Sequence, residues 1–225
     1  MNSFFEYYFD EYDFSKKETA VCCPFPHHTA SGMEYQETNP SAHVNLDKGL
    51  FHCKVCDKGL SEIAFIAEVL GCRYEDATKI AKMFTTKEDR FTWENDIQLT
   101  PEIKQKCLDL GISETVINDL QLKTELGDEI AFPVFMYGKV VDVRSYRPQD
   151  RANKIRSRVG TTTGMIIPYD IWRETPETKW TILCAGEKDM AVTRSHGFNA
   201  ITLTGGEKAL PKCINPFMNR KIAIC

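Results

Sequence analysis

Two closely spaced pairs of potential metal ligands, one of two cysteines and one of a cysteine and a histidine, constrain the first third of this chain more than any other feature. In Cys53-Lys54-Val55-Cys56, two thiolates separated by two residues can reach one metal ion, and we expect Gly59 to relax the following turn. The other pair lies upstream, in Cys23-Pro24-Phe25-Pro26-His27. A lone CxxC pair also suits redox chemistry. The upstream pair favours a closed Cys3His zinc site, which is the structural type.

The residues next to the upstream pair leave part of the ligand set open. Cys22 precedes Cys23 and His28 follows His27, so either neighbour offers an alternative ligand. We favour Cys23 and His27, with Cys53 and Cys56 completing the site. The other cysteines of the chain are scattered, which is typical of inert thiols in a reducing compartment.

Short strands and amphipathic helices are predicted around this site. Residues 42–46 and 50–53 have the pattern of two paired strands, which places His43 and His52 on strand faces. Apolar residues then recur at helical spacing from 63 to 70 and from 77 to 84. Ser61 is a plausible N-cap for the first of these helices, and Gly71 a plausible stop. We therefore expect a small zinc domain that ends near residue 84.

These segments resemble the zinc-finger signature of bacterial and phage DNA primases. That family has CPFH, then TPSF-x-V, then an aromatic residue before H-C-x-x-C-G. This chain has Cys23-Pro24-Phe25, then 39–45 as NPSAHVN, then 49–56 as GLFHCKVC. Two departures are an extra residue, Pro26, before the histidine and an insertion at 29–37.

The second half of the chain is expected to open with two short helices, at 103–110 and 116–120. Runs of apolar residues then predict strands at 129–135 and 139–144, joined through Tyr137-Gly138. This hairpin is similar to one found in the primase core.

A locally basic segment follows the hairpin. Residues 139–160 hold seven cationic side chains and two anionic ones, whereas the whole chain has a net charge of −4. Such a segment suits binding of template or nucleotide phosphates, and the alternative is a solvated loop. The resemblance to primases favours phosphate binding. The candidate residues are Arg144, Arg147, Lys154, Arg156 and Arg158.

A strand at 181–185, a helix at 188–196 and a strand at 199–203 predict a parallel βαβ unit. Its turn, Gly186-Glu187-Lys188-Asp189, resembles the first motif of the TOPRIM fold, E-G-x-x-D. The resemblance implies catalytic carboxylates that hold Mg²⁺ or Mn²⁺. Because Ala185 occupies the family's glutamate position, Glu187 and Asp189 are the candidate catalytic residues.

The predicted strand at 221–225 resembles the one that precedes the paired aspartates, D-x-D, of TOPRIM enzymes. The sequence contains no such pair after it. We therefore expect the N-terminal piece of a phage primase or primase-helicase, inactive by itself.

The N-terminal aromatic residues alternate with acidic ones, which would repel phosphate. A short helix that docks on the zinc domain or on a partner is the better interpretation. The expected organisation is an acidic aromatic segment (1–20), a zinc-binding domain (21–84), a linker (85–98), the first part of a primase core (99–178) and an incomplete TOPRIM subdomain (179–225).

The predicted fold class is α+β, with a zinc ribbon followed by an α/β primase core. By resemblance, the function is template-directed synthesis of short RNA primers on single-stranded DNA. The implied ligands and partners are structural Zn²⁺, catalytic Mg²⁺ or Mn²⁺, ribonucleoside triphosphates and a replicative helicase. The alternatives are a non-catalytic module that binds single-stranded DNA or a replication partner, and a TOPRIM nuclease or topoisomerase. No stretch of 18 apolar residues is present and the acidic start is unlike a signal peptide, so we expect a cytoplasmic protein without membrane partners.

Overall fold

A computed structural model describes residues 3–85, 99–125, 128–147, 155–157 and 163–225. The chain divides into two compact units, Met1–Glu88 (unit 1) and Asp89–Cys225 (unit 2). The linker predicted at 85–98 lies, except for its first residue, outside the described residues. In the described ranges, no helix combines the length and the apolar character needed to cross a membrane.

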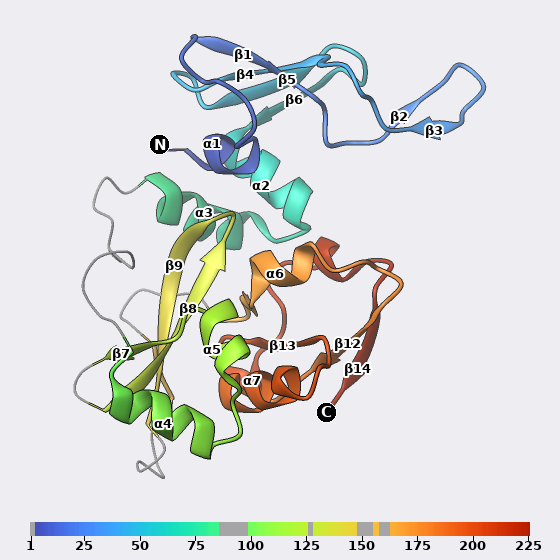
Figure 1. Ribbon diagram of the computed structural model, residues 1–225. Helices are drawn as coiled ribbons and strands as arrows, with labels where there is room; N and C mark the ends of the chain where they lie inside the picture. Colours follow the sequence, from blue (N-terminus) through green and yellow to red (C-terminus); the bar gives the residue numbers. More distant parts are fainter. Residues whose placement is uncertain (1–2, 86–98, 126–127, 148–154, 158–162) are drawn as a thin grey trace. The chain divides into compact units, whose positions relative to one another are not determined.

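Unit 1 is built on a four-stranded antiparallel sheet (Figure 1). The strands lie in the order β1 (Glu18–Val21), β4 (Ala42–Asn45), β5 (Leu50–Cys53) and β6 (Lys58–Ser61). The two predicted strands are thus confirmed as β4 and β5. His43 and His52 are cross-strand partners on the less buried face, because alternate side chains of a strand point to opposite faces.

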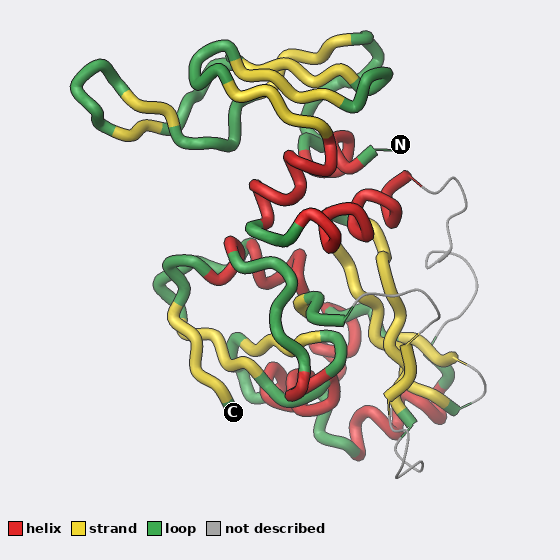
Figure 2. Tube along the Cα trace, turned by 180° about the vertical axis from the view of Figure 1, so that it is seen from behind, coloured by secondary structure: helices red, strands yellow, loops and turns green. Residues whose placement is uncertain are grey.

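A second, two-stranded sheet joins β2 (His27–His28) to β3 (Glu34–Tyr35). Figures 1 and 2 both show this hairpin extending away from the four-stranded sheet of unit 1. It contains most of residues 29–37, the insertion relative to the zinc-finger signature of primases.

Three helices complete unit 1: α1 (Phe4–Tyr8), α2 (Glu62–Leu70) and α3 (Tyr74–Thr85). Ser61 accepts a hydrogen bond from the Ala64 amide at 3.3 Å, and Gly71 ends α2 in the left-handed conformation with φ of 60°. Both predicted helix boundaries are therefore confirmed.

The N-terminal segment docks on the rest of unit 1, as expected. Phe4 and Phe5 are fully buried, and the Phe5 ring meets that of Phe65 with centroids 5.1 Å apart. The Ser3 hydroxyl and the Phe4 amide both donate to Glu62 at 2.6 Å. These buried aromatic rings belong to a core and are not available to stack on nucleic-acid bases.

Unit 2 contains an antiparallel sheet and a mainly parallel one. The first has the order β10 (Ile155–Ser157), β9 (Lys139–Tyr146), β8 (Glu129–Met136) and β7 (Lys123–Glu125), and it follows helices α4 (Pro101–Asp109) and α5 (Glu114–Asp119). The predicted β8–β9 hairpin is confirmed. Tyr137 and Gly138 turn it with positive φ angles of 51° and 74°, and both amides donate to Asp170 at 2.7 Å.

The second sheet has the order β11 (Ile166–Ile167), β13 (Ala200–Leu203), β12 (Trp180–Leu183) and β14 (Lys221–Ile224). Strand β12 is parallel to both β13 and β14, and β11 is antiparallel to β13. Helix α7 (Glu187–Ser195) connects β12 to β13, which confirms the βαβ unit with the helix one residue earlier than predicted. The carboxyl ends of β12, β13 and β14 therefore meet at one edge.

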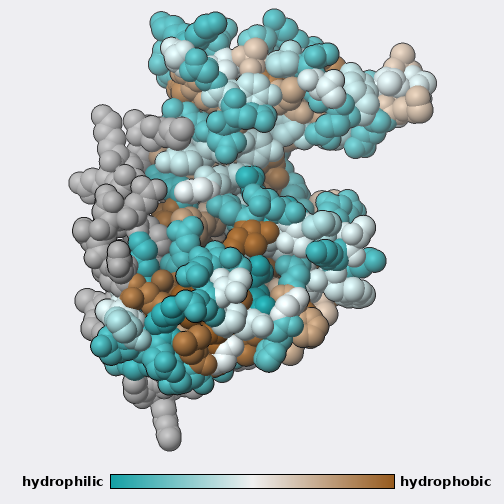
Figure 3. Space-filling view, viewed as in Figure 1, coloured by the Kyte–Doolittle hydropathy of each residue, from teal (hydrophilic) through white to brown (hydrophobic). Residues whose placement is uncertain are grey.

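The remaining elements of unit 2 are α6 (Tyr169–Arg173) and two short 3₁₀ helices, η1 (Gly206–Lys208) and η2 (Asn215–Phe217). On the face of unit 2 seen in Figure 3, apolar side chains form separate groups among hydrophilic ones. The mixture of helices with antiparallel and parallel sheets confirms the α+β class.

Candidate functional site

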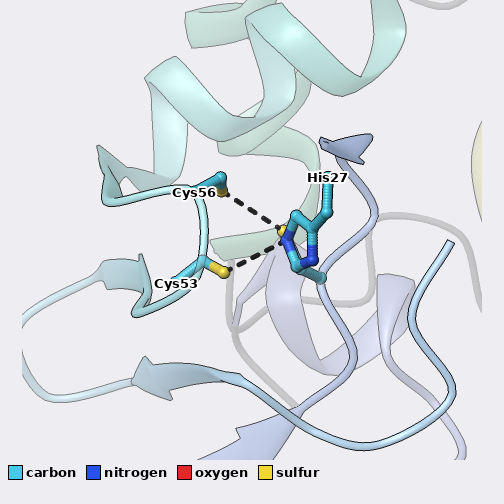
Figure 4. Close-up of side chains that lie close together, drawn as sticks. His27, Cys53 and Cys56 are labelled. Atoms are coloured by element: carbon cyan, nitrogen blue, oxygen red, sulfur yellow. Dashed lines mark hydrogen bonds between the residues drawn. The ribbon is translucent and has the colours of Figure 1, made fainter. Parts of the chain in front are cut away.

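Four side chains of unit 1 bring their ligand atoms within 4.8 Å of one another: Cys23, His27, Cys53 and Cys56. Cys53 ends β5 and Cys56 lies in the following turn, while Cys23 follows β1 and His27 begins β2. Figure 4 shows the His27 ring facing Cys53 and Cys56. Residues 26 to 33 positions apart in the sequence thus converge on one point.

The spacing of these atoms suits a tetrahedral zinc ion. The Sγ atoms of Cys23 and Cys56 lie 3.9 Å apart, and Nε2 of His27 lies 3.4 Å from Sγ of Cys53. Ideal zinc–ligand distances place two tetrahedral sulfurs about 3.8 Å apart, and a sulfur and a nitrogen about 3.6 Å apart. The donor set and its geometry therefore fit structural zinc.

The neighbouring residues that the sequence left open lie elsewhere. His27 and His28 are consecutive in β2, so their side chains point to opposite faces: His27 is buried and His28 is exposed. The backbone amide of Cys22 donates to the Tyr12 hydroxyl at 3.1 Å, and the Cys22 thiol is not in the cluster. Strand alternation thus decides which histidine faces the cysteines.

The turn after Cys56 corrects one expectation. Gly59 does not relax this turn, because it lies in β6 and is paired with His52. The left-handed residue is Asp57, with φ of 53°. Aspartate tolerates this conformation better than most residues, which explains how the turn forms without glycine there.

Burial disfavours the charged thiolate form, so three thiolates are difficult to hold together without a cation. Burial raises the pKa of the Cys23 thiol well above its ordinary value and also raises the pKa of Cys56. Burial opposes ionisation of Cys53 too, but hydrogen bonds from Ser41 and from the amides of Cys56 and Val55 lower its pKa to about 6. A bound dication would favour the thiolate form of all three, because metal binding displaces their protons.

Two residues near the cluster were missed from the sequence. The Glu37 carboxylate accepts a hydrogen bond from the Cys23 amide, and the Ser41 hydroxyl lies 3.3 Å from Sγ of Cys53. Ser41 is part of the NPS segment, which was recognised as a motif but not as a contact of the site. The sequence did not point to Glu37, because this residue lies in the inserted segment, outside the family signature.

In unit 2, the first candidate catalytic residue is engaged in a buried ion pair. Glu187 is the first residue of α7, and its side chain is 2% exposed. It accepts a hydrogen bond of 2.9 Å from Nε of Arg144, whose side chain is 7% exposed. The structure thus joins a predicted catalytic residue to a predicted phosphate-binding residue.

The second candidate, Asp189, has a half-exposed side chain that lies 2.9 Å from Nζ of Lys188. Among the described residues, the only group of three or more potential ligands from His, Cys, Asp and Glu is the one in unit 1. The described part of the parallel sheet edge therefore lacks a carboxylate cluster that fits Mg²⁺ or Mn²⁺.

The predicted basic residues have different surroundings. Arg147 forms an ion pair with the buried Glu129, while Arg156 is exposed on β10. Lys154 and Arg158 lie outside the described residues. Arg156 is therefore the described member of this group that is best placed to meet a phosphate.

Comparison with known proteins identifies the zinc-binding part. Residues 13–93 match the family model of the DnaG zinc ribbon, described as the CHC2 zinc finger. This match confirms the resemblance to primases that the cysteine and histidine motifs predicted. No curated protein matches the chain.

Two similar solved structures come from primases. The Aquifex aeolicus primase (zinc binding and RNA polymerase domains) has 16% identity and a TM-score of 0.45; the match covers 95% of this chain and 66% of that one. The primase fragment of the bacteriophage T7 primase-helicase protein has 12% identity and a TM-score of 0.37, covering 83% of this chain and 69% of that one. This chain thus spans just under two thirds of the Aquifex structure.

Proposed function

We propose that this chain is part of a DNA primase, which synthesises short RNA primers on single-stranded DNA. The observation that carries the proposal is the Cys3His cluster, because it lies within the segment that matches the CHC2 zinc finger. In this proposal Cys23, His27, Cys53 and Cys56 hold one structural zinc ion. Zinc then stabilises the fold of unit 1, since structural zinc binding and folding are coupled.

Unit 1 would contact the single-stranded template, and unit 2 would contribute to the polymerase core. Support for the second role is the predicted TOPRIM-like order of β12, α7, β13 and β14, with its parallel strands ending at one edge. Arg156 is exposed and suits a template or nucleotide phosphate. Ribonucleoside triphosphates, a replicative helicase and a cytoplasmic location belong to the same proposal.

The catalytic roles of Glu187 and Asp189 are proposed for the complete protein only. Primer synthesis needs a divalent ion held by carboxylates, and the described residues do not gather such a set. Because Glu187 is paired with Arg144, its present contact holds the start of α7 against the β8–β9 hairpin.

The test is template-directed incorporation of ribonucleotides by the zinc-loaded complete gene product with Mg²⁺ or Mn²⁺. We expect incorporation that Cys53→Ser abolishes, and zinc-dependent binding of single-stranded DNA without incorporation by residues 1–225. Binding without incorporation by the complete product would instead support a non-catalytic module. DNA nicking without ribonucleotides would indicate a TOPRIM nuclease or topoisomerase.

A further inference from the structure

A buried carboxylate lies directly behind the candidate zinc ligands. Glu37 follows the β2–β3 hairpin and precedes β4, and its side chain is 7% exposed. Carboxylates are rarely buried without a specific set of partners, because removing their charge from water is unfavourable. The contacts of Glu37 therefore indicate why it is held there.

Glu37 contacts two of the four candidate ligands. Its Oε1 atom accepts hydrogen bonds from the backbone amide of Cys23 and, at 3.4 Å, from that of Ser41. Its Oε2 atom lies 3.6 Å from Nδ1 of His27. One carboxylate thus faces the backbone of the first ligand and the ring of the second.

The His27 ring needs an acceptor at this position. Nε2 faces Sγ of Cys53, so a metal bound there leaves the proton of the neutral ring on Nδ1. Nδ1 is buried and has no hydrogen-bond partner within the described part of the chain. At 3.6 Å from Nδ1, Oε2 of Glu37 lies about 0.4 Å beyond the usual hydrogen-bond range of ~2.7–3.2 Å, so a small movement on metal binding would complete the contact.

We propose that Glu37 is a positioning residue of the zinc centre, which accepts the Nδ1 proton of His27 and so presents Nε2 to the metal. Metal-binding histidines commonly donate their other ring nitrogen to a carboxylate, and this contact orients the ring and raises its basicity. The proposal rests on the proposed zinc site and not on primer synthesis. Ser41, near Cys53, extends the same outer layer of contacts.

The main competing explanation is that Glu37 only anchors the backbone through the Cys23 amide. Glu37→Gln separates the two roles, because glutamine keeps a carbonyl oxygen for that amide but removes the charge facing His27. Glu34→Gln is the matched control, since Glu34 is exposed on β3 of the same hairpin.

The experiment measures zinc affinity of the full chain by competition with a chromophoric chelator. We expect Glu37→Gln to weaken zinc binding by about 10–100-fold and Glu34→Gln to leave it unchanged. The same substitution is then made in a His27→Cys background, where the fourth ligand is a thiolate that has no proton to donate. There, removing the negative charge of Glu37 should leave zinc affinity unchanged or increase it.

An equal loss of affinity in both backgrounds, or no loss in the His27 background, would overturn the proposal. Failure of the unaltered chain to bind one zinc ion would instead overturn the metal centre itself. A second measurement is available if the His27→Cys variants do not fold. Solvent exchange of the His27 Nδ1 proton, followed by NMR in the zinc-loaded protein, should accelerate in Glu37→Gln, and equal exchange rates would contradict the proposal.

Discussion

Replacing Arg144 by methionine should lower the free energy of unfolding of unit 2 by about 3–5 kcal/mol. The substitution leaves the Glu187 carboxylate, which is 2% exposed, without its charged partner. At the observed separation of 2.9 Å, the gross attraction is about 6 kcal/mol for an effective dielectric constant of ~20. The cost of burying both charges offsets much of this attraction, so the penalty arises mainly from the stranded carboxylate.

Tryptophan fluorescence in a urea titration measures this effect on unit 2. Of the three tryptophans of the chain, Trp172 and Trp180 are described and lie in unit 2, and the Trp172 ring is fully buried. With a urea dependence of about 1–3 kcal/mol per molar, the expected penalty lowers the midpoint by at least ~1 M. Arg156→Met is the matched control, because this exposed arginine lies on the same sheet and should change the midpoint little.

The double variant Arg144→Met/Glu187→Met tests the cause. Removing both charges eliminates the stranded carboxylate, so much of the lost stability should return. The reasoning is refuted if Arg144→Met changes the unfolding free energy by less than ~1 kcal/mol, or if the double variant is less stable than Arg144→Met alone.

Three further results are expected. Cys53→Ser should release zinc and unfold unit 1, whose folding is coupled to the metal; stoichiometric zinc with a native melting profile would contradict this. Arg156→Gln should weaken single-stranded DNA binding to a similar degree for all sequences and reduce the salt dependence by about one ion, which a salt titration of binding checks; an unchanged slope would argue against a phosphate contact. Gly164→Ala should destabilise unit 2 by more than ~2 kcal/mol, because Gly164 has φ of 81° and an added Cβ would overlap the carbonyl oxygen of Leu210; an unchanged urea midpoint would contradict this.

Local sequence patterns were sufficient for most of the secondary structure. The N-cap at Ser61, the left-handed Gly71 and the Tyr137-Gly138 turn each depend on neighbouring residues, so their signals lie within a few positions of the chain. The metal-binding pairs were also readable, because the spacing of Cys53 and Cys56 by itself allows both to reach one ion.

Charge counting along the chain was less informative. The segment at 139–160 is basic, yet Arg144 and Arg147 pair with Glu187 and Glu129, which lie outside it. The Arg144–Glu187 pair joins residues 43 positions apart. Local net charge therefore did not reveal which cations are already neutralised by the fold.

The sequence by itself determined the zinc-finger motif, the α+β class and the βαβ unit, because these follow from ligand spacing and from short-range periodicity. The sequence favoured Cys23 and His27 over their neighbours, and the tertiary structure brought their ligand atoms together with those of Cys53 and Cys56. Only the tertiary structure placed Glu37, 14 positions after Cys23, next to these residues. The physical reason is that a ligand's direction and a buried charge's partner depend on how strands alternate and pack. Those relations arise between segments that are distant in the sequence and meet only in the folded chain.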